Sequence, residues 1–257
     1  MQISNIKSAQ NDLVKYAVKL QSSKYRKNSK KILIDGQKSV TGLIEQDFNI
    51  EYLFLKEDDE INQKYKTQIE NRVENLVFVN DEILKKISTT KSPASIIAII
   101  KEPKINKDIF KNMKKIVLID GIKDAGNLGT IIRSAVAFSI EGIILFNECV
   151  DLYNTKTIRA TAQNIFKIPI IMTSDINFIK DLKQNHKLIS AVVNSNNDFR
   201  NYEFKENFIL ALGSEANGVS DEILSVTDDS LTLFMDNDVE SLNLAVCASI
   251  CFALIKI

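Results

Sequence analysis

Residues that commonly mark metal, disulfide or acid–base sites are scarce in this 257-residue chain. Its three cysteines are an odd number without paired spacing, which favours neither a disulfide framework nor a zinc site. The single histidine, His186, lies in the polar segment KQNHK with no partner signal, which argues against histidine-based catalysis. We therefore expect no metal site.

Long apolar runs and an excess of either charge are also missing. No run reaches membrane-spanning length, and the N-terminus, MQISNIKSAQNDLVK, lacks the apolar core of a signal peptide. We expect a cytoplasmic protein without membrane association. Basic and acidic residues number 33 each, so no global basic field indicates a nucleic acid. An RNA substrate would need a local basic patch.

A lysine-rich segment with one proline, IKEPKINKDIFKNMKK, separates two patterned parts of the chain. We expect one domain at residues 1–102, a linker at 103–114 and a second domain at 115–257. In the first domain, apolar strands alternate with helical patterns, which is typical of a small α/β domain. The expected strands are 31–35, 51–55, 76–79 and 94–100, and the expected helices are 11–20 and 37–45.

The second domain also alternates short apolar strands with helices. This pattern predicts an α/β fold with a mostly parallel sheet that is covered on both faces. The expected strands are 116–119, 142–146, 188–193, 208–212 and 231–235, and the expected helices are 130–138, 155–166 and 243 to the C-terminus.

Three segments of this domain combine a strand end with glycines and polar side chains: LIDGIKDAGNLGTIIRSAVAF, FILALGSEANGVS and LTLFMDNDVESLNL. In the first, we expect an Asn-Leu-Gly break, with Gly126 and Gly129 free to adopt positive φ, before a helix that carries Arg133. The glycine spacing does not fit the dinucleotide fingerprint, which argues against a nicotinamide-dependent enzyme.

Together the three segments resemble the signature motifs of the SpoU-type RNA ribose 2'-O-methyltransferases of the SPOUT superfamily. The family typically shows DGxxDPGNLGTIIRTA, then LGSEGxG, then IPMxGxVESLNVSVA. Ala125, Ala216, Phe234 and Asn237 depart from this pattern, and none of them removes a polar side chain on which the chemistry would depend. In the first domain, YRKNSKKILIDG resembles the opening of the family's L30e-like substrate-binding domain.

The resemblance implies an S-adenosylmethionine-dependent RNA 2'-O-ribose methyltransferase with a deep trefoil knot where the last two motifs thread through one another. It also implies a homodimer whose active site spans the interface. Because family members that act on transfer RNA commonly lack the accessory domain, the resemblance implies ribosomal RNA rather than transfer RNA as the substrate. The alternatives are a transfer RNA 2'-O-methyltransferase, a base methyltransferase and a non-catalytic RNA-binding protein of the same fold.

The resemblance further implies three sets of site residues. The candidate catalytic residues are Asn127, Arg133, Glu215, Ser241 and Asn243. The candidate cofactor-binding residues are Leu212, Gly213, Ser214, Gly218, Leu233, Met235 and Leu242. The candidate RNA-binding residues are Lys24, Arg26, Lys27, Lys30, Lys31, Lys156 and Arg159.

Several of these residues have a structural alternative. Arg133 is costly to bury without a partner, so it either forms a structural salt bridge with Glu215 or contacts the target nucleotide. In the second case it would act as a base or, more easily, hold a phosphate and stabilise the developing alkoxide. Asn243 can equally be a helix cap. Gly213 is expected to leave room for the cofactor, so that Gly213→Val would abolish cofactor binding without unfolding the protein.

Overall fold

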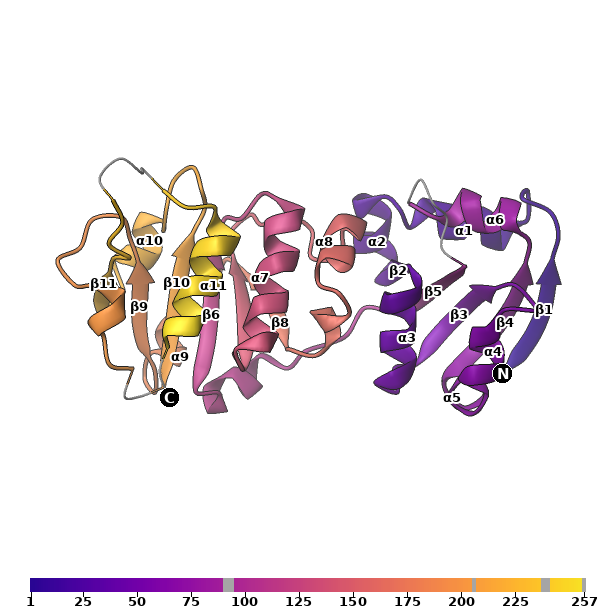
Figure 1. The fold of residues 1–257 in the computed structure, drawn as a ribbon, viewed down its shortest axis with the longest axis horizontal. Coiled ribbons are helices and arrows are strands. Elements are labelled where there is room, and N and C mark those ends of the chain that lie inside the picture. The colour runs from indigo at the N-terminus through magenta and orange to yellow at the C-terminus, as the bar shows by residue number, and fades with distance from the viewer. Residues whose placement is uncertain (90–94, 205–206, 237–240, 256–257) are drawn as a thin grey trace. The chain divides into compact units, whose positions relative to one another are not determined.

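Figure 1 shows the computed structural model of the chain, which describes residues 1–89, 95–204, 207–236 and 241–255. Its internal contacts divide the chain into two compact units. The first unit is Met1–Lys104 with Tyr153–Gln163, and the second is Ile105–Leu152 with Asn164–Ile257. None of the described helices is long and apolar enough to cross a membrane.

The first unit contains a five-stranded sheet in the order β1-β4-β3-β5-β2. Strand β5 runs antiparallel to both of its neighbours, and the other pairs are parallel. Apolar side chains of helices α1 and α6 pack against the sheet. The elements are β1 (Gln2–Ile6), α1 (Asp12–Lys19), α2 (Ser23–Ser29), β2 (Lys31–Asp35), α3 (Gln37–Glu45), β3 (Ile50–Leu55), α4 (Glu60–Lys64), α5 (Lys66–Arg72), β4 (Val73–Val79), α6 (Asp81–Ile87), β5 (Ile96–Lys101) and α8 (Thr155–Ala160).

The second unit is built on a six-stranded sheet in the order β11-β9-β10-β6-β7-β8, in which every pair is parallel. The elements are η1 (Lys107–Asn112), β6 (Lys115–Asp120), α7 (Ala125–Ala137), β7 (Gly142–Phe146), η2 (Asn164–Phe166), β8 (Ile170–Thr173), α9 (Ile176–Leu182), β9 (Lys187–Ala191), η3 (Phe199–Asn201), β10 (Phe208–Gly213), α10 (Asp221–Leu224), β11 (Asp229–Leu231) and α11 (Leu244–Leu254).

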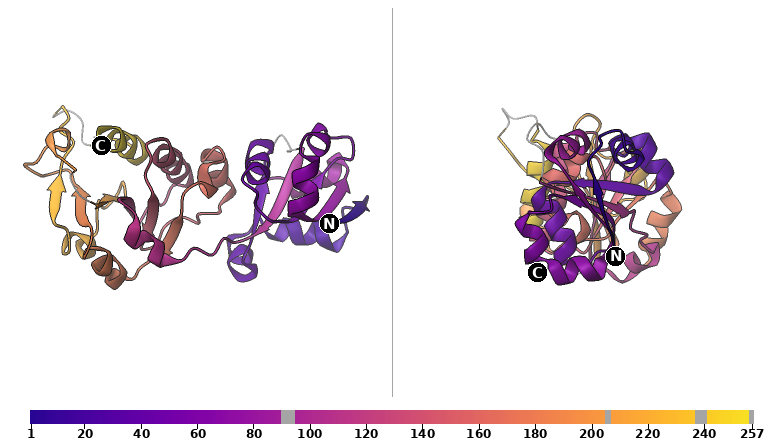
Figure 2. Two further views of the ribbon diagram at one scale, coloured as in Figure 1. Left: turned by 90° about the horizontal axis from the view of Figure 1, so that it is seen from below. Right: turned by 90° about the vertical axis from the view of Figure 1, so that its right-hand side faces the viewer.

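Helices lie on both sides of this sheet (Figure 2). Helices α7 and α11 pack together, and the apolar side chains of η1, α9 and α10 form a core with alternate residues of the strands. Strand β7 is buried along its whole length, as expected for a parallel sheet covered on both faces. The predicted α/β architecture with a parallel sheet is therefore confirmed.

The predicted Asn-Leu-Gly break before Thr130 is wrong, because helix α7 already begins at Ala125. Gly126 and Gly129 lie inside the helix. The side chain of Asp124 accepts a hydrogen bond from the backbone N–H of Asn127 at 2.8 Å and caps the helix. The cap and the burial of the first turns outweigh the local preference of glycine for irregular backbone.

Three further boundaries differ from the predictions. The expected helix 155–166 ends at Ala160, because Ala162 and Gln163 adopt positive φ values of 47° and 79°. The last strand covers only Asp229–Leu231. The segment expected to be a linker contains η1, whose Phe110 is fully buried in the core of the second unit.

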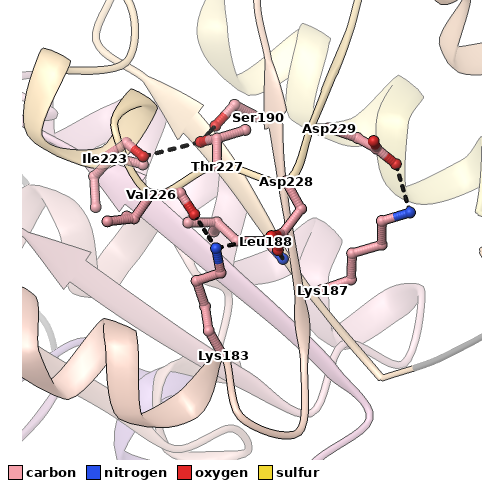
Figure 3. Close-up of polar contacts among 9 residues, drawn as sticks. All are labelled: Lys183, Lys187, Leu188, Ser190, Ile223, Val226, Thr227, Asp228 and Asp229. Atoms are coloured by element: carbon pink, nitrogen blue, oxygen red, sulfur yellow. Dashed lines mark hydrogen bonds and ion pairs between the residues drawn. The ribbon is translucent and has the colours of Figure 1, made fainter.

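Polar contacts fix the turn before β11 to strand β9 (Figure 3). The Asp228 carboxylate accepts a hydrogen bond from the backbone N–H of Leu188 at 2.8 Å, and it forms an ion pair with Lys183 at 2.8 Å. The adjacent Asp229 pairs with Lys187 at 2.7 Å. These contacts hold a strand of three residues in place at the edge of the sheet.

We expect Asp229 to make the stability of the protein depend on pH. Hydrogen bonds from Lys187 and then from Tyr202 lower the pKa of the Asp229 carboxyl below its ordinary value. A depressed carboxyl pKa stabilises the fold above the unfolded-state pKa, and this contribution is lost as the pH falls through the folded-state pKa. Asp229→Asn should therefore make the urea midpoint fall less steeply as the pH is lowered below about pH 5.

Asp108→Asn is the control for this measurement, because it removes a carboxylate whose side chain is 73% exposed in the same unit. If the midpoints of Asp229→Asn and the wild type fall in parallel with acid, the contribution assigned to Asp229 is absent.

Candidate active site

Three segments that are distant in the sequence meet in a hydrogen-bonded cluster of the second unit. The side-chain amide of Asn127, in the first turn of α7, donates to the carboxylate of Glu215 in the loop after β10. The side-chain amide of Asn243 donates to the carbonyl oxygen of Asn127 at 3.1 Å. Asn127 thus uses both ends of its amide, which fixes its orientation. We call these three residues the Asn127–Glu215–Asn243 cluster.

Asn243 serves this cluster and helix α11 at the same time. Its side-chain oxygen accepts hydrogen bonds from the backbone N–H groups of Ala245 at 3.0 Å and Val246 at 3.3 Å, so that it is the N-cap of the helix. The sequence left capping and site membership open as alternatives for Asn243. Asn243 fills both roles, because its side-chain oxygen caps the helix and its side-chain nitrogen donates to Asn127.

A buried carboxylate beside the cluster was not among the predicted residues. Asp120, the last residue of β6, is 3% exposed. It accepts a hydrogen bond from the side-chain amide of Asn147 at 2.8 Å and another from the backbone N–H of Ser220 at 2.9 Å. These residues line a cavity of about 680 Å³ that Glu215 also borders. The only sequence signal was that Asp120 and Asn147 each end or follow an apolar strand.

The loop after β10 closes tightly on itself. Two backbone hydrogen bonds join Ser214 and Gly218, at 3.1 and 2.9 Å. A Cβ atom at Gly213 would lie 1.8 Å from the carbonyl carbon of Gly218 and 2.0 Å from the backbone nitrogen of Val219. The space beside Gly213 is thus filled by the protein's own backbone. The expectation that Gly213→Val would leave the fold intact is wrong.

Exposed apolar side chains lie just beyond the carboxyl ends of the neighbouring strands β9 and β11. Val193 and Met235 are 66% and 37% exposed, and Leu233 is half-buried. Leu242, which is also half-buried, lies two residues before α11. Leu212, in β10, is fully buried and contributes only packing with its side chain. Parallel sheets bind ligands outside their carboxyl ends, and an exposed apolar surface there suits the flat ring of an adenine.

Comparison with known proteins identifies the family. The model of the SpoU rRNA Methylase family matches residues 114–253, more than half of the chain. The model of the MRM3-like substrate binding domain matches residues 11–98. The chain belongs to the SpoU rRNA Methylase family. This membership confirms the prediction of an S-adenosylmethionine-dependent RNA methyltransferase with an N-terminal substrate-binding domain.

Several relatives align with this chain over most of its length. It is 27% identical over 249 residues to the 23S rRNA (guanosine(2553)-2'-O)-methyltransferase RlmP of Bacillus subtilis (strain 168), covering 96% of this chain and 97% of the relative. It is 21% identical over 234 residues to the 23S rRNA (uridine(2479)-2'-O)-methyltransferase of Streptomyces viridochromogenes, covering 87% and 82%. The crystal structure of AdoMet-bound rRNA methyltransferase from Sinorhizobium meliloti has a TM-score of 0.90 at 25% identity, covering 99% and 97%.

Two predicted catalytic residues lie outside the cluster. Arg133 is exposed on α7 and forms no hydrogen bond or ion pair with any described residue. Its proposed salt bridge with Glu215 is not formed, because the carboxylate of Glu215 bonds to Asn127 instead. Ser241 is exposed shortly before α11. Asn237, one of the departures from the family pattern, lies outside the described residues.

The predicted basic cluster of the first unit is only partly available to a ligand. Arg26 is 5% exposed, and its guanidinium donates to the carbonyl oxygens of Leu20 at 2.8 Å and Gln21 at 2.7 Å, at the end of α1. Lys31 is mostly buried in an ion pair with Glu51. Both cations are therefore engaged in holding the fold together.

The other predicted RNA-binding residues are exposed. Lys24 and Lys27 form no ion pair with any residue in the described part of the chain, and Lys30 pairs loosely with Glu102 at 3.5 Å. On α8, Lys156 is exposed, and Arg159 donates to the hydroxyl of Thr89 at 2.9 Å. The exposed lysines Lys24 and Lys27 are therefore the best candidates for phosphate contacts in this set.

His186 is buried, and both of its ring nitrogens lie close to backbone carbonyl oxygens. The ring nitrogens of His186, which is 3% exposed, lie 2.9 Å from the carbonyl oxygen of Leu182 and 2.6 Å from that of Met113. These contacts give His186 a structural role in the second unit. Within the ranges that the structure describes, no group of three or more His, Cys, Asp or Glu side chains could hold a metal ion.

We expect Gly213→Ala to destabilise the protein far more than Gly218→Ala. The first substitution forces a Cβ into the backbone of the loop and should cost more than about 3 kcal/mol of unfolding free energy. The second meets no atom within 4 Å and only strains a residue at φ 66°, at a cost of about 1–2 kcal/mol. Thermal melting and urea unfolding of both variants measure the difference, and equal losses would contradict the steric assignment.

Proposed function

We propose that this SpoU-family protein transfers the methyl group of S-adenosylmethionine to a ribose 2'-oxygen of ribosomal RNA. The observation that carries the proposal is the Asn127–Glu215–Asn243 cluster, which joins the three predicted motifs through hydrogen bonds. The names of the Bacillus subtilis and Streptomyces viridochromogenes relatives as 23S rRNA 2'-O-methyltransferases support the choice of atom and of RNA.

S-adenosylmethionine supplies an activated methyl group, so this chain must bind it, align the ribose and assist the loss of the hydroxyl proton. The exposed and half-buried apolar residues Leu233, Met235 and Leu242 would hold the adenine. The backbone of the closed loop from Gly213 to Gly218 would approach the rest of the cofactor. The fit rests on the apolar surface at the carboxyl ends of β9 and β11.

The cluster would position the ribose. A carboxylate and amides held by one another are preorganised to accept and donate hydrogen bonds with sugar hydroxyls, at little further cost in entropy. A guanidinium stabilises a developing alkoxide better than it removes a proton, since arginine stays protonated in proteins. We therefore assign alkoxide stabilisation to Arg133, and an additional substrate contact to Ser241.

A homodimer would bring Arg133 into the site. Arg133 follows Asn127 by six residues on α7, so the two side chains point about 120° apart around the helix axis. The packed helices α7 and α11 also expose Phe138, Val246 and Ile250, which are 42%, 48% and 38% exposed. Exposed apolar side chains on two packed helices suit contact with a second copy of the chain. Arg133 of the partner subunit would then complete the cluster.

One assay distinguishes this function from the alternatives, which are methylation of transfer RNA, methylation of a base and RNA binding without catalysis. Transfer RNA and ribosomal RNA are offered with labelled cofactor, and the product is tested for resistance to alkaline cleavage, which 2'-O-methylation confers and base methylation does not. No transfer to either RNA would favour a non-catalytic RNA-binding protein. The trefoil knot and the cytoplasmic location stay predictions.

Mixing two inactive variants should restore activity if the site is shared between subunits. Arg133→Ala alone should keep cofactor affinity and lose on the order of a hundredfold or more in turnover. Glu215→Gln should also be nearly inactive, because Asn127 loses its charged partner. A refolded equal mixture should recover about a quarter of wild-type activity, because half of the dimers contain one intact site of two.

Arg133→Lys is the matched control for the chemistry, since an ammonium cannot reproduce a planar two-pronged contact and should restore little activity. Separate measurement of melting temperature and of cofactor affinity excludes a folding defect. A mixture that remains as inactive as its components would show that each chain carries a self-contained site.

Neutralising the exposed lysines of α2 should weaken RNA binding and its salt dependence. In Lys24→Ala/Lys27→Ala, the slope of the logarithm of the binding constant against the logarithm of salt should shrink by about 1 for each lost phosphate contact. Lys66→Ala/Lys85→Ala, on α5 and α6, removes the same charge elsewhere in the first unit. If both pairs of substitutions give the same slope, α2 is ordinary surface.

A further inference from the structure

A polar pocket adjoins the Asn127–Glu215–Asn243 cluster. Apart from Glu215 and the loop that carries it, the residues of its wall take no part in the chemistry proposed above. Its volume of about 680 Å³ falls within the roughly 300–1,000 Å³ of small-molecule sites. Its walls include the residues that follow strands β6, β7, β8 and β10 directly, at the edge of the sheet where such folds bind ligands. Glu215 belongs both to this wall and to the cluster.

The polar groups of the pocket wall are held in fixed orientations. Because the carboxylate of Asp120 only accepts hydrogen bonds, the amide of Asn147 must present its nitrogen to it and keeps its carbonyl oxygen as an acceptor. No described residue donates to that oxygen. The hydroxyl of Ser220 is also buried without a hydrogen-bond partner in the described structure. Of these two groups, the carbonyl oxygen of Asn147 is the one that remains free to accept a hydrogen bond from a ligand, because the Ser220 hydroxyl is fully buried.

The rim of the pocket carries two carboxylates and one ammonium group. Glu148 is 99% exposed and lies 3.7 Å from Lys123, which is 67% exposed and donates to the backbone oxygen of Glu148. Glu215 is the second carboxylate. Carboxylates repel the phosphates of RNA, so at an RNA site they are favourable only where they accept hydrogen bonds, from a ribose hydroxyl as proposed for Glu215 or from a base.

We propose that this pocket holds the base of the nucleotide whose ribose is methylated, and that it selects guanine. The inference rests on the proposed function, since a ribose at the cluster would place its base beside Glu215. Guanine alone has two adjacent donors, N1–H and the N2 amino group, next to a carbonyl oxygen. The carboxylate of Glu148 matches the two donors, and the ammonium of Lys123 matches O6.

The methylated product tests the choice of base. Ribosomal RNA from a strain that lacks this gene is incubated with the full-length protein and S-adenosylmethionine that carries an isotopically labelled methyl group. The RNA is digested to nucleosides, and the nucleosides that carry the label are identified by mass spectrometry. We expect 2'-O-methylguanosine. A 2'-O-methylated adenosine, cytidine or uridine would overturn the guanine assignment and leave the proposed function standing. The absence of any 2'-O-methylated nucleoside would refute the proposed function itself.

Glu148→Gln tests the proposed role of the pocket, because the two possible roles of Glu148 predict opposite changes in RNA binding. Removal of an exposed carboxylate should strengthen RNA binding if that carboxylate only repels phosphate, as expected for the control Glu222→Gln on α10. A carboxylate that accepts base N–H groups predicts the opposite, a KM for RNA about tenfold higher. The affinity for S-adenosylmethionine, measured by calorimetry, should equal that of the wild type.

Two results would overturn the proposal. A lowered KM in Glu148→Gln, as in the control, would make Glu148 a repelling surface charge. Weaker binding of S-adenosylmethionine in this variant would assign the pocket to the cofactor. Because the Glu148 side chain is almost fully exposed, the substitution does not put folding at risk.

Discussion

The buried carboxylate of Asp120 is the interaction on which the geometry of the site depends. A carboxylate is costly to bury unless its oxygens are hydrogen-bonded, and both oxygens of Asp120 have a partner. One partner follows β7 and the other, Ser220, ends the loop that leaves β10. The carboxylate thus ties the loops of three strands together at the carboxyl edge of the sheet. Within that frame, the closed turn from Ser214 to Gly218 presents Glu215 to Asn127.

The remaining members of the cluster sit on helix starts, which are rigid and self-supporting. Asn127 lies in the first turn of α7 behind the Asp124 cap, and Asn243 is itself the cap of α11. The two helices pack together, and their hydroxyls Ser134 and Ser249 lie 2.7 Å apart. A side chain on a capped and packed helix keeps its position without help from a ligand. The cluster is therefore preorganised before any substrate binds.

The sequence predicted what depends on local pattern and missed what depends on distant neighbours. The strand 142–146 was predicted with its observed bounds, because a buried parallel strand is a continuous apolar run. The start of α7 was misplaced, because the cap at Asp124 and tertiary packing outweigh glycine propensity. Arg26 belongs to a run of cations in the sequence, yet its guanidinium is buried against backbone carbonyls that only the fold brings near. Asp120 and Ser220 are 100 residues apart, and no local signal connects them.

The chain has no net charge although its proposed substrate is RNA. This is consistent with one surface that provides affinity for RNA and a different surface that provides specificity for the base. Phosphate contacts supply affinity and position an RNA without reading its sequence, whereas contacts to base edges specify it. Exposed lysines such as Lys24 belong to the first unit, and the carboxylate-rich pocket beside Glu215 belongs to the second. A strongly basic second unit would hold any RNA at the site of chemistry. Carboxylates there disfavour the binding of a nucleotide unless its base donates hydrogen bonds to them. Methyl transfer would therefore favour a nucleotide with such a base over competing nucleotides.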